Sequence, residues 1–271
     1  MKAIVSHDID HITVLEHLFK DTIVPKFMMR MHIELLKGKI TSREYLLRWG
    51  DFFKNKWQNI DELITFNNVN HIPSSFFIAV KSGIGLNYSN TTALLWIEQM
   101  KRRHCEIGAH GIEFEGVEKI NDEFQLFQSL TNIKRFGVRM HYIRKDKDTF
   151  SLLENTGYTY DSTEYAFKNP YKIGKMWEFP FQIMDGWIIE NGKKWQSLNL
   201  EQAKEKTKQL IQRAYDCDLN YLGIDFHDRY FSHSFSTWLE WYVWLVDYLK
   251  TNKIECVNFE MAIRELESKN T

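Results

Sequence analysis

Residues 2–11 read KAIVSHDIDH. The apolar run from Ala3 to Val5 leads directly into two histidines and two aspartates within five residues. Ionisable side chains are costly to bury, so such a dense group of them beside a buried strand needs a compensating role. An apolar run that ends in polar side chains is typical of a parallel strand whose carboxyl end carries a site.

The same pattern of a short apolar run and a following helical segment recurs along the chain. The apolar runs are residues 3–6, 75–80, 106–110, 136–140, 158–161, 177–183, 221–227 and 254–259. Regular alternation of strands and helices predicts an α/β protein with a mainly parallel sheet. Because we find no internal repeat and no Pro/Gly-rich linker, we expect one domain over residues 1–271. Residues 12–70 are mostly helical and rich in aromatic and basic residues, and we expect an elaboration after the first strand there.

The composition excludes several classes of protein. With 44% hydrophobic residues among 271, the chain can bury a large core and is not disordered. Thirty-five basic and 36 acidic residues leave a formal charge of -1, which gives no overall electrostatic footprint for nucleic acid or for an anionic membrane. The three cysteines are widely spaced and suit a reducing compartment. We find neither a secretory signal pattern nor an apolar run of membrane-spanning length, so we expect a cytoplasmic protein without a transmembrane segment.

Polar residues stand at the end of nearly every apolar run. They are Asp8, Asp10, His110, Arg139, His141, Asp161, Glu178 and His227. Parallel strands bring their carboxyl ends to one edge of a sheet, where the sites of α/β proteins are built. A single histidine at a strand end is more often structural than functional, but this many polar residues at one edge predict a common site.

These residue types suit one kind of chemistry. Aspartate and imidazole ligands hold zinc or a similar divalent metal while leaving positions open for water and substrate. A second carboxylate can take the proton of a water activated in this way, a histidine can protonate a leaving amine, and an arginine can orient the carboxylate. The set predicts a metal-assisted amide or ester hydrolase.

Seven short motifs follow one another along nearly the whole chain. They are SHDID at 6–10, SSFFI at 74–78, EIGAHGIEF at 106–114, RMHY at 139–142, YDST at 160–163, EFPF at 178–181 and IDFHDRYFS at 224–232. In this order they resemble the motifs of the NodB-homology polysaccharide deacetylases, carbohydrate esterase family 4. The resemblance implies a distorted (β/α)7–8 barrel, here with a helical insertion after strand one.

The resemblance also implies roles for individual residues. Asp8 matches the base and Asp10 the metal-binding aspartate of the first motif. His110 takes the position of the first metal-binding histidine, and Arg139 that of the arginine that holds the base. His227 matches the strand-end histidine of the last motif, for which we expect the role of general acid, with Asp228 or Asp161 bonded to its other ring nitrogen.

Two positions depart from the family pattern. The second metal-binding histidine is replaced by Phe114, which cannot bind a metal, and the proline of the third motif is replaced by His141. We expect His141 to supply the missing imidazole from a neighbouring strand end. His11 and, with less support, Glu113 are the alternatives, whereas His7 should point to the opposite face of the strand from Asp8. Without a replacement ligand the protein would be weakly active or inactive.

Substrate contacts are expected near the same edge of the sheet. The candidates are Tyr142, Asp161, Trp177, Glu178 and Tyr230, with Trp187 as a further aromatic residue. Lys26, Arg30, Lys37 and Lys39 in the insertion are expected to form a solvated helix face. A nucleotide- or lipid-linked sugar would give these basic residues a second use.

The function implied is metal-dependent, most simply zinc-dependent, removal of an acetyl group from an N-acetylated sugar. Cytoplasmic location favours an intermediate of surface polysaccharide assembly, such as O-antigen or capsule, over extracellular chitin or peptidoglycan. Two alternatives stay open. One is hydrolysis of another C–N bond, for example in a small cyclic amide, and the other is a non-catalytic carbohydrate-binding relative, which the loss at Phe114 keeps in view.

Overall fold

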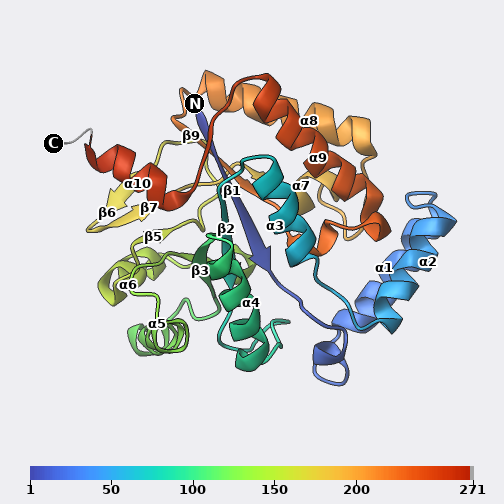
Figure 1. Cartoon of the computed structure of the whole chain (residues 1–271), viewed down its shortest axis with the longest axis horizontal. Helices are drawn as coiled ribbons and strands as arrows, with labels where there is room; N and C mark the ends of the chain where they lie inside the picture. Colours follow the sequence, from blue (N-terminus) through green and yellow to red (C-terminus); the bar gives the residue numbers. More distant parts are fainter. Residues whose placement is uncertain (269–271) are drawn as a thin grey trace.

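Residues 1–268 are described by the computed structural model, in which ten strands form one curled sheet with helices packed around it (Figure 1). The strands are β1 Lys2–Ile9, β2 Ser74–Ile78, β3 Glu106–Gly111, β4 Val138–Met140, β5 Tyr160–Asp161, β6 Tyr171–Ile173, β7 Met176–Glu178, β8 Ile183–Met184, β9 Tyr221–Asp225 and β10 Cys256–Val257. Their order is β6-β7-β5-β4-β3-β2-β1-β9-β8, with β10 paired to β1. The α/β fold and the distorted barrel expected from the motifs are confirmed.

All strand pairs are parallel except β6 with β7. Strand β1 lies at the centre and is buried along its whole length after Lys2, which explains its continuous apolar start. It pairs with β2 on one side and β9 on the other. The carboxyl ends of early and late strands therefore meet at the same edge.

The helices are distributed around the sheet. They are α1 Ile23–Leu36, α2 Ser42–Phe53, α3 Ile60–Val69, α4 Asn90–Arg102, α5 Val117–Thr131, α6 Thr149–Thr156, α7 Asp185–Ile189, α8 Leu200–Asp216, α9 Ser236–Thr251 and α10 Phe259–Ser268, with short 3-10 turns η1 Leu15–His17, η2 His141–Ile143, η3 Asp228–Tyr230 and η4 His233–Phe235. Residues 12–70 are helical as expected, and α1 and α2 lie together at one end of the molecule (Figure 1). Within residues 1–268, no helix has both the length and the apolarity that crossing a bilayer requires.

One apolar run differs from its prediction. Residues 177–183 form two strands, because β7 pairs with β5 while β8 pairs with β9 at the other end of the sheet. Pro180 lies between them and cannot donate to a strand ladder, so the run could not continue as one central strand. The chain crosses the open side of the barrel here, and Phe181 is fully buried in the crossing.

The helical elaboration is fixed to the rest of the fold by a buried ion pair. Arg48 on α2 pairs with Glu34 on α1, and both side chains are buried. Arg48 Nε also donates to the Ser234 carbonyl oxygen at 2.8 Å, in the turn that precedes α9. This contact sets α1 beside the carboxyl edge of the sheet.

Candidate metal centre

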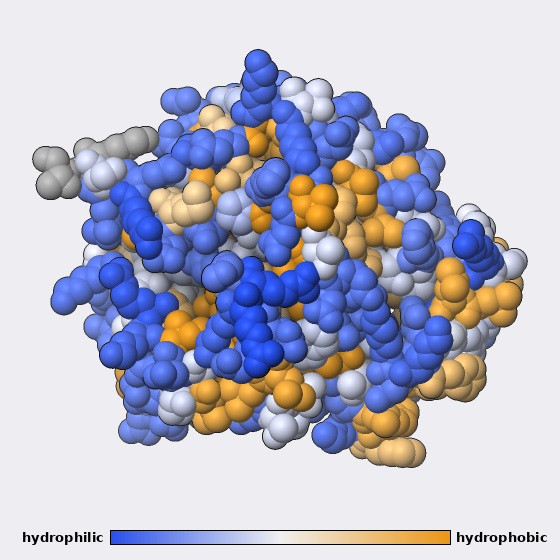
Figure 2. Space-filling model, in the orientation of Figure 1, coloured by the Kyte–Doolittle hydropathy of each residue, from blue (hydrophilic) through white to orange (hydrophobic). Residues whose placement is uncertain are grey.

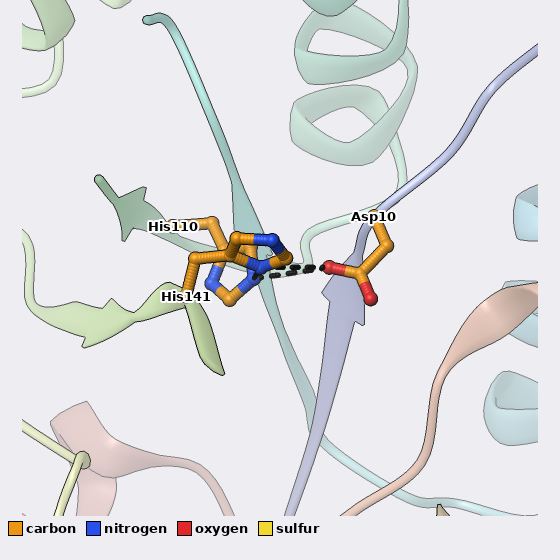
Figure 3. Close-up of side chains that lie close together, drawn as sticks. All are labelled: Asp10, His110 and His141. Carbon is orange, nitrogen blue, oxygen red and sulfur yellow. Dashed lines mark hydrogen bonds and ion pairs between the residues drawn. The ribbon is translucent and has the colours of Figure 1, made fainter. Parts of the chain in front are cut away.

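Three side chains meet at the carboxyl edge of the sheet (Figure 3). Asp10 follows β1, His110 lies near the end of β3, and His141 follows β4. Asp10 Oδ1 lies 3.2 Å from His110 Nε2 and 3.2 Å from His141 Nδ1. The two ring nitrogens are 3.0 Å apart. The strand pairing His110↔Arg139 brings β3 and β4 into register, which places the two histidines side by side.

Both histidines use their other nitrogen to hold a backbone carbonyl. His110 Nδ1 lies 3.0 Å from the Arg139 oxygen, and His141 Nε2 lies 3.1 Å from the Ile84 oxygen. A carbonyl oxygen can only accept, so these nitrogens carry the ring protons. In the neutral rings, the two nitrogens that face each other therefore carry lone pairs and no proton. Three lone-pair atoms can lie this close only if a cation sits among them or one ring takes up an extra proton.

The donor set fits a zinc-like divalent metal. One carboxylate and two neutral imidazoles, each fixed by a backbone hydrogen bond, are typical of such a centre. Ligands at about 2.0–2.1 Å around a tetrahedral ion lie about 3.3 Å from one another, close to the separations of these three atoms. Burial would raise the pKa of Asp10, but the charge and hydrogen bonds of the two histidines hold it well below its usual value.

A second carboxylate lies directly beneath this cluster. Asp8 is buried, and its Oδ2 lies 4.0 Å from His110 Nε2. Arg139 Nη1 donates to Asp8 Oδ1 at 3.0 Å and to Asp225 Oδ1 at 2.8 Å. Arg139 therefore holds Asp8 through a single hydrogen bond, and its Nε and Nη2 donate to Ser162. Burial and the charge of Asp8 raise the pKa of Asp225 to about 7.

His227 approaches the cluster from β9. Its Nε2 lies 3.6 Å from Asp10 Oδ2, and its Nδ1 donates to Asp185 Oδ1 at 2.9 Å. Burial would lower the pKa of His227, but the charges of Asp185 and Asp225 outweigh it and raise the pKa well above the usual value. The expectation that Asp228 or Asp161 bonds His227 is wrong, because Asp185 occupies that position. Asp228 accepts from the Asn59 backbone, and Asp161 from Thr163.

The alternative ligands lie elsewhere. His11 packs edge-to-face against His17 at a ring separation of 4.6 Å. Glu113 pairs with Lys81, and Phe114 lies under the Arg144 guanidinium. His7 faces the outer layer as expected, where Asn67 and the Phe226 carbonyl bind its two nitrogens. Among the candidates, His141 is the residue that the fold brings to Asp10 and His110.

Two adjoining clefts open from this cluster. One of about 430 Å³ runs toward α1, and one of about 230 Å³ runs toward α7. Asp10, Tyr142 and Tyr230 line both clefts, so the two aromatic rings lie where substrate contacts were expected. Tyr142 is 62% exposed and has a φ of 57°, a conformation that costs energy in a residue other than glycine. Trp187 lines the smaller cleft.

Three expected substrate contacts are wrong. Asp161 and Glu178 are fully buried, and Trp177 packs in the apolar interior of the barrel with Tyr160 and Phe179. Asp161 and Glu178 pair with each other across β5 and β7. Burial raises the pKa of both carboxyl groups, and the charge of Asp161 raises that of Glu178 further. Their position at strand ends was correct, but their side chains turn away from the clefts.

Two residues of the site were missed in the sequence. Asp225 lies two positions before His227 on β9, and side chains at that spacing share one face of a strand. Asp185 directly follows β8, so the same strand-end rule that selected the others also applies to it. The apolar run at residues 177–183 predicts one continuous strand, which leaves no strand end directly before Asp185.

Solved structures share this fold. A protein from Mycobacterium smegmatis assigned as a polysaccharide deacetylase matches with a TM-score of 0.63 and 13% identity, over 99% of this chain and 91% of its own. One from Pseudomonas aeruginosa PAO1 with the same assignment gives 0.59 and 16%, over 76% and 72%. Puue allantoinase gives 0.65 and 13%, over 98% and 89%. No protein-family profile and no curated protein matches the sequence.

Proposed function

We propose that the protein is a metal-dependent hydrolase that removes an acetyl group from an N-acetylated sugar. One observation carries the proposal. A carboxylate oxygen and two imidazole nitrogens converge at the cleft, and a buried carboxylate and a carboxylate-bound histidine lie beside them. A fold shared with proteins assigned as polysaccharide deacetylases supports the same reaction class.

Asp10, His110 and His141 would hold the metal. A bound divalent ion supplies a Lewis acid that polarises the amide carbonyl and eases removal of a proton from water. Asp8 would accept that proton, and its hydrogen bond to Arg139 keeps its carboxylate oriented toward the cluster. Arg139 is itself fixed by Asp225 and Ser162, so the base is held on a rigid support.

His227 would donate the proton that the departing amine needs. Its Nε2 faces Asp10 at the cleft, while Asp185 fixes its Nδ1. Asp8 is held by Arg139, whereas His227, two residues after β9, is held by Asp185. The two side chains come within 4.8 Å of each other, and their different partners would allow one group to take a proton while the other gives one, as amide hydrolysis requires.

The clefts fit a sugar with a charged carrier. Tyr142 and Tyr230 offer ring faces for a sugar, and Lys26 and Lys194 line the larger cleft. Neither lysine has an ion-pair partner within residues 1–268. Arg229 lies in the same wall against the rings of Phe27 and Trp57. We propose a sugar carried on a nucleotide or lipid phosphate, as in surface polysaccharide assembly.

Acetate release from uridine diphosphate N-acetylhexosamines tests the proposal. The protein is stripped with a chelator and assayed before and after zinc is restored. We expect activity only after zinc is added, and Asp10→Ala should stay inactive at the same zinc concentration. Equal activity of the stripped and restored protein would contradict a metal-dependent hydrolase.

A further inference from the structure

Helix α2 exposes several of its large apolar side chains. Its buried residues are Glu44 and Arg48, which bond Ser236 and Ser234 in the turn before α9. Leu46 and Phe53 are 68% and 77% exposed on the opposite face. Tyr45, Trp49 and Phe52 of α2 pack against the core. Leu46 and Phe53 remain exposed, although a surface helix normally turns its large apolar side chains to the core.

Neighbouring segments extend this apolar surface. Seven of the exposed large hydrophobic residues lie in η1, α1, α2 and the loop between η1 and α1, and we call them the hairpin surface: Leu15, Phe19, Met29, Leu36, Leu46, Leu47 and Phe53. The Leu15 backbone donates to Asn55 at 2.8 Å, which places η1 beside the end of α2. Figure 2 shows apolar atoms gathered at the end of the molecule where α1 and α2 lie. Large exposed apolar patches mark interaction sites.

The charge around the hairpin surface has one sign. Residues 12–57 contain nine lysines and arginines against five acidic residues, although the whole chain carries -1. Glu16, Glu34 and Glu44 are buried, and Asp21 and Asp51 are half-buried. Lys20, Lys26, Lys37, Arg43 and Lys54 are exposed. The outward charge of this segment is therefore basic, a local excess that the net charge of the whole chain does not show.

We propose that the hairpin surface docks on an anionic lipid bilayer. Exposed apolar side chains among basic ones, without exposed acids, match the boundary between acidic headgroups and acyl chains. Lys26 and Met29 belong both to the exposed face of α1 and to the wall of the larger cleft. Docking would therefore bring the cleft to the membrane surface. The docking would make the substrate a sugar attached to a membrane lipid, and this statement about the substrate rests on the proposed function.

Vesicle co-sedimentation tests the docking without any measure of activity. The probes are vesicles of phosphatidylcholine alone and of phosphatidylcholine with phosphatidylglycerol. We expect binding to the mixed vesicles that weakens with added salt, and little binding to phosphatidylcholine. Leu46→Gln with Phe53→Gln should weaken binding at least about tenfold. Arg43→Glu with Lys54→Glu should weaken it by a similar factor.

A matched control comes from other helices. Val69 on α3 and Leu95 on α4 are 73% and 66% exposed, so Val69→Gln with Leu95→Gln removes similar apolar area away from the hairpin surface. This pair should bind vesicles as the unaltered protein does. Far-ultraviolet circular dichroism of each variant checks that α2 is retained.

Three outcomes would overturn the docking. They are no binding to the mixed vesicles, equal loss in the control pair, and a dimer in solution that Leu46→Gln with Phe53→Gln dissociates while vesicle binding is absent. Zinc binding and acetate release from a soluble sugar nucleotide are measured on the same samples. If the protein binds zinc and releases acetate but does not bind vesicles, only the docking is rejected. If it binds vesicles but neither binds zinc nor releases acetate, only the proposed function is rejected.

Discussion

One nitrogen of the Arg139 guanidinium donates hydrogen bonds to two buried carboxylates. Its Nη1 donates to Asp8 and to Asp225, and its remaining donors are occupied by Ser162. Burying a guanidinium group costs free energy unless its donors form hydrogen bonds. Here these bonds hold the Asp8 carboxylate toward the metal cluster. The proposed base therefore depends on Arg139, Asp225 and Ser162 as well as on Asp8.

The role of Asp8 can be tested by an isosteric change. Asp8→Asn keeps the size of the side chain but removes its ability to accept a proton. We expect the metal content to stay the same and kcat to fall by about 10²-fold or more. Metal analysis and acetate release measure the two quantities. Full turnover by the variant would assign the base to another group.

The role of His227 can be tested by changing the leaving group. An amide needs a proton on the departing nitrogen, whereas p-nitrophenyl acetate has a leaving group that departs as an anion. His227→Ala should therefore lower amide hydrolysis by about 10²-fold or more and ester hydrolysis far less. Asp185→Asn should act in the same direction with a smaller effect, because it only holds the ring. Equal losses on both substrates would reject the role of acid.

Residue-scale prediction from the sequence succeeded where a strand end alone decides position. Asp8, Asp10, His110, Arg139 and His141 lie together because each ends a strand of the same sheet. The rule gives the edge but not the direction of each side chain. Asp161, Glu178 and Trp177 stand near the same edge and point into the buried interior. Packing around them, which the sequence does not specify locally, decides that direction.

At the scale of elements, a carboxyl group of β3 helps to hold the last helix against the sheet. Glu106 on β3 accepts from the backbone of Phe259, the first residue of α10, at 2.9 Å and from Ser75 at 2.7 Å. Desolvation under α10 raises the pKa of Glu106 to about 7. The folded protein therefore holds this proton more tightly than the unfolded chain does.

This shift predicts a loss of stability at higher pH. A raised carboxyl pKa contributes stability that is fully present below its unfolded value and is lost as pH rises through about 7. Glu106→Gln cannot lose a proton, so its free energy of unfolding should gain on that of the unaltered protein from about pH 5 to about pH 8. Urea unfolding at each pH measures this difference. Glu118→Gln, at an exposed position of α5, is the control and should show no such change with pH. A difference that does not change with pH would contradict the coupling.

Element prediction was limited by buried apolar runs. A strand covered on both faces reads as a continuous apolar stretch, and so does a buried crossing between two strands. Residues 177–183 contain β7, a crossing and β8 in one such stretch. Only Pro180 marked the break. The position of β8 beside β9 then depends on the curl of the whole sheet, which no local pattern gives.

At the scale of the whole molecule, the curl of the sheet assembles the site. His227 is far from Asp10 in sequence, but β9 pairs directly with β1, so their ends adjoin. The α/β class followed from the alternation of strands and helices, and the barrel from the motif order. The exposure of Leu46 and Phe53 on α2 did not follow, because helix periodicity does not show which side of a helix the core covers.

Anomalous scattering from a crystal grown with zinc would locate the metal. We expect an ion within about 2.0–2.1 Å of Asp10 Oδ1, His110 Nε2 and His141 Nδ1. Crystals of His141→Ala under the same conditions should show markedly reduced occupancy there. An ion bound instead by His11, Glu16 and His17, or no ion at the three predicted atoms, would contradict the account.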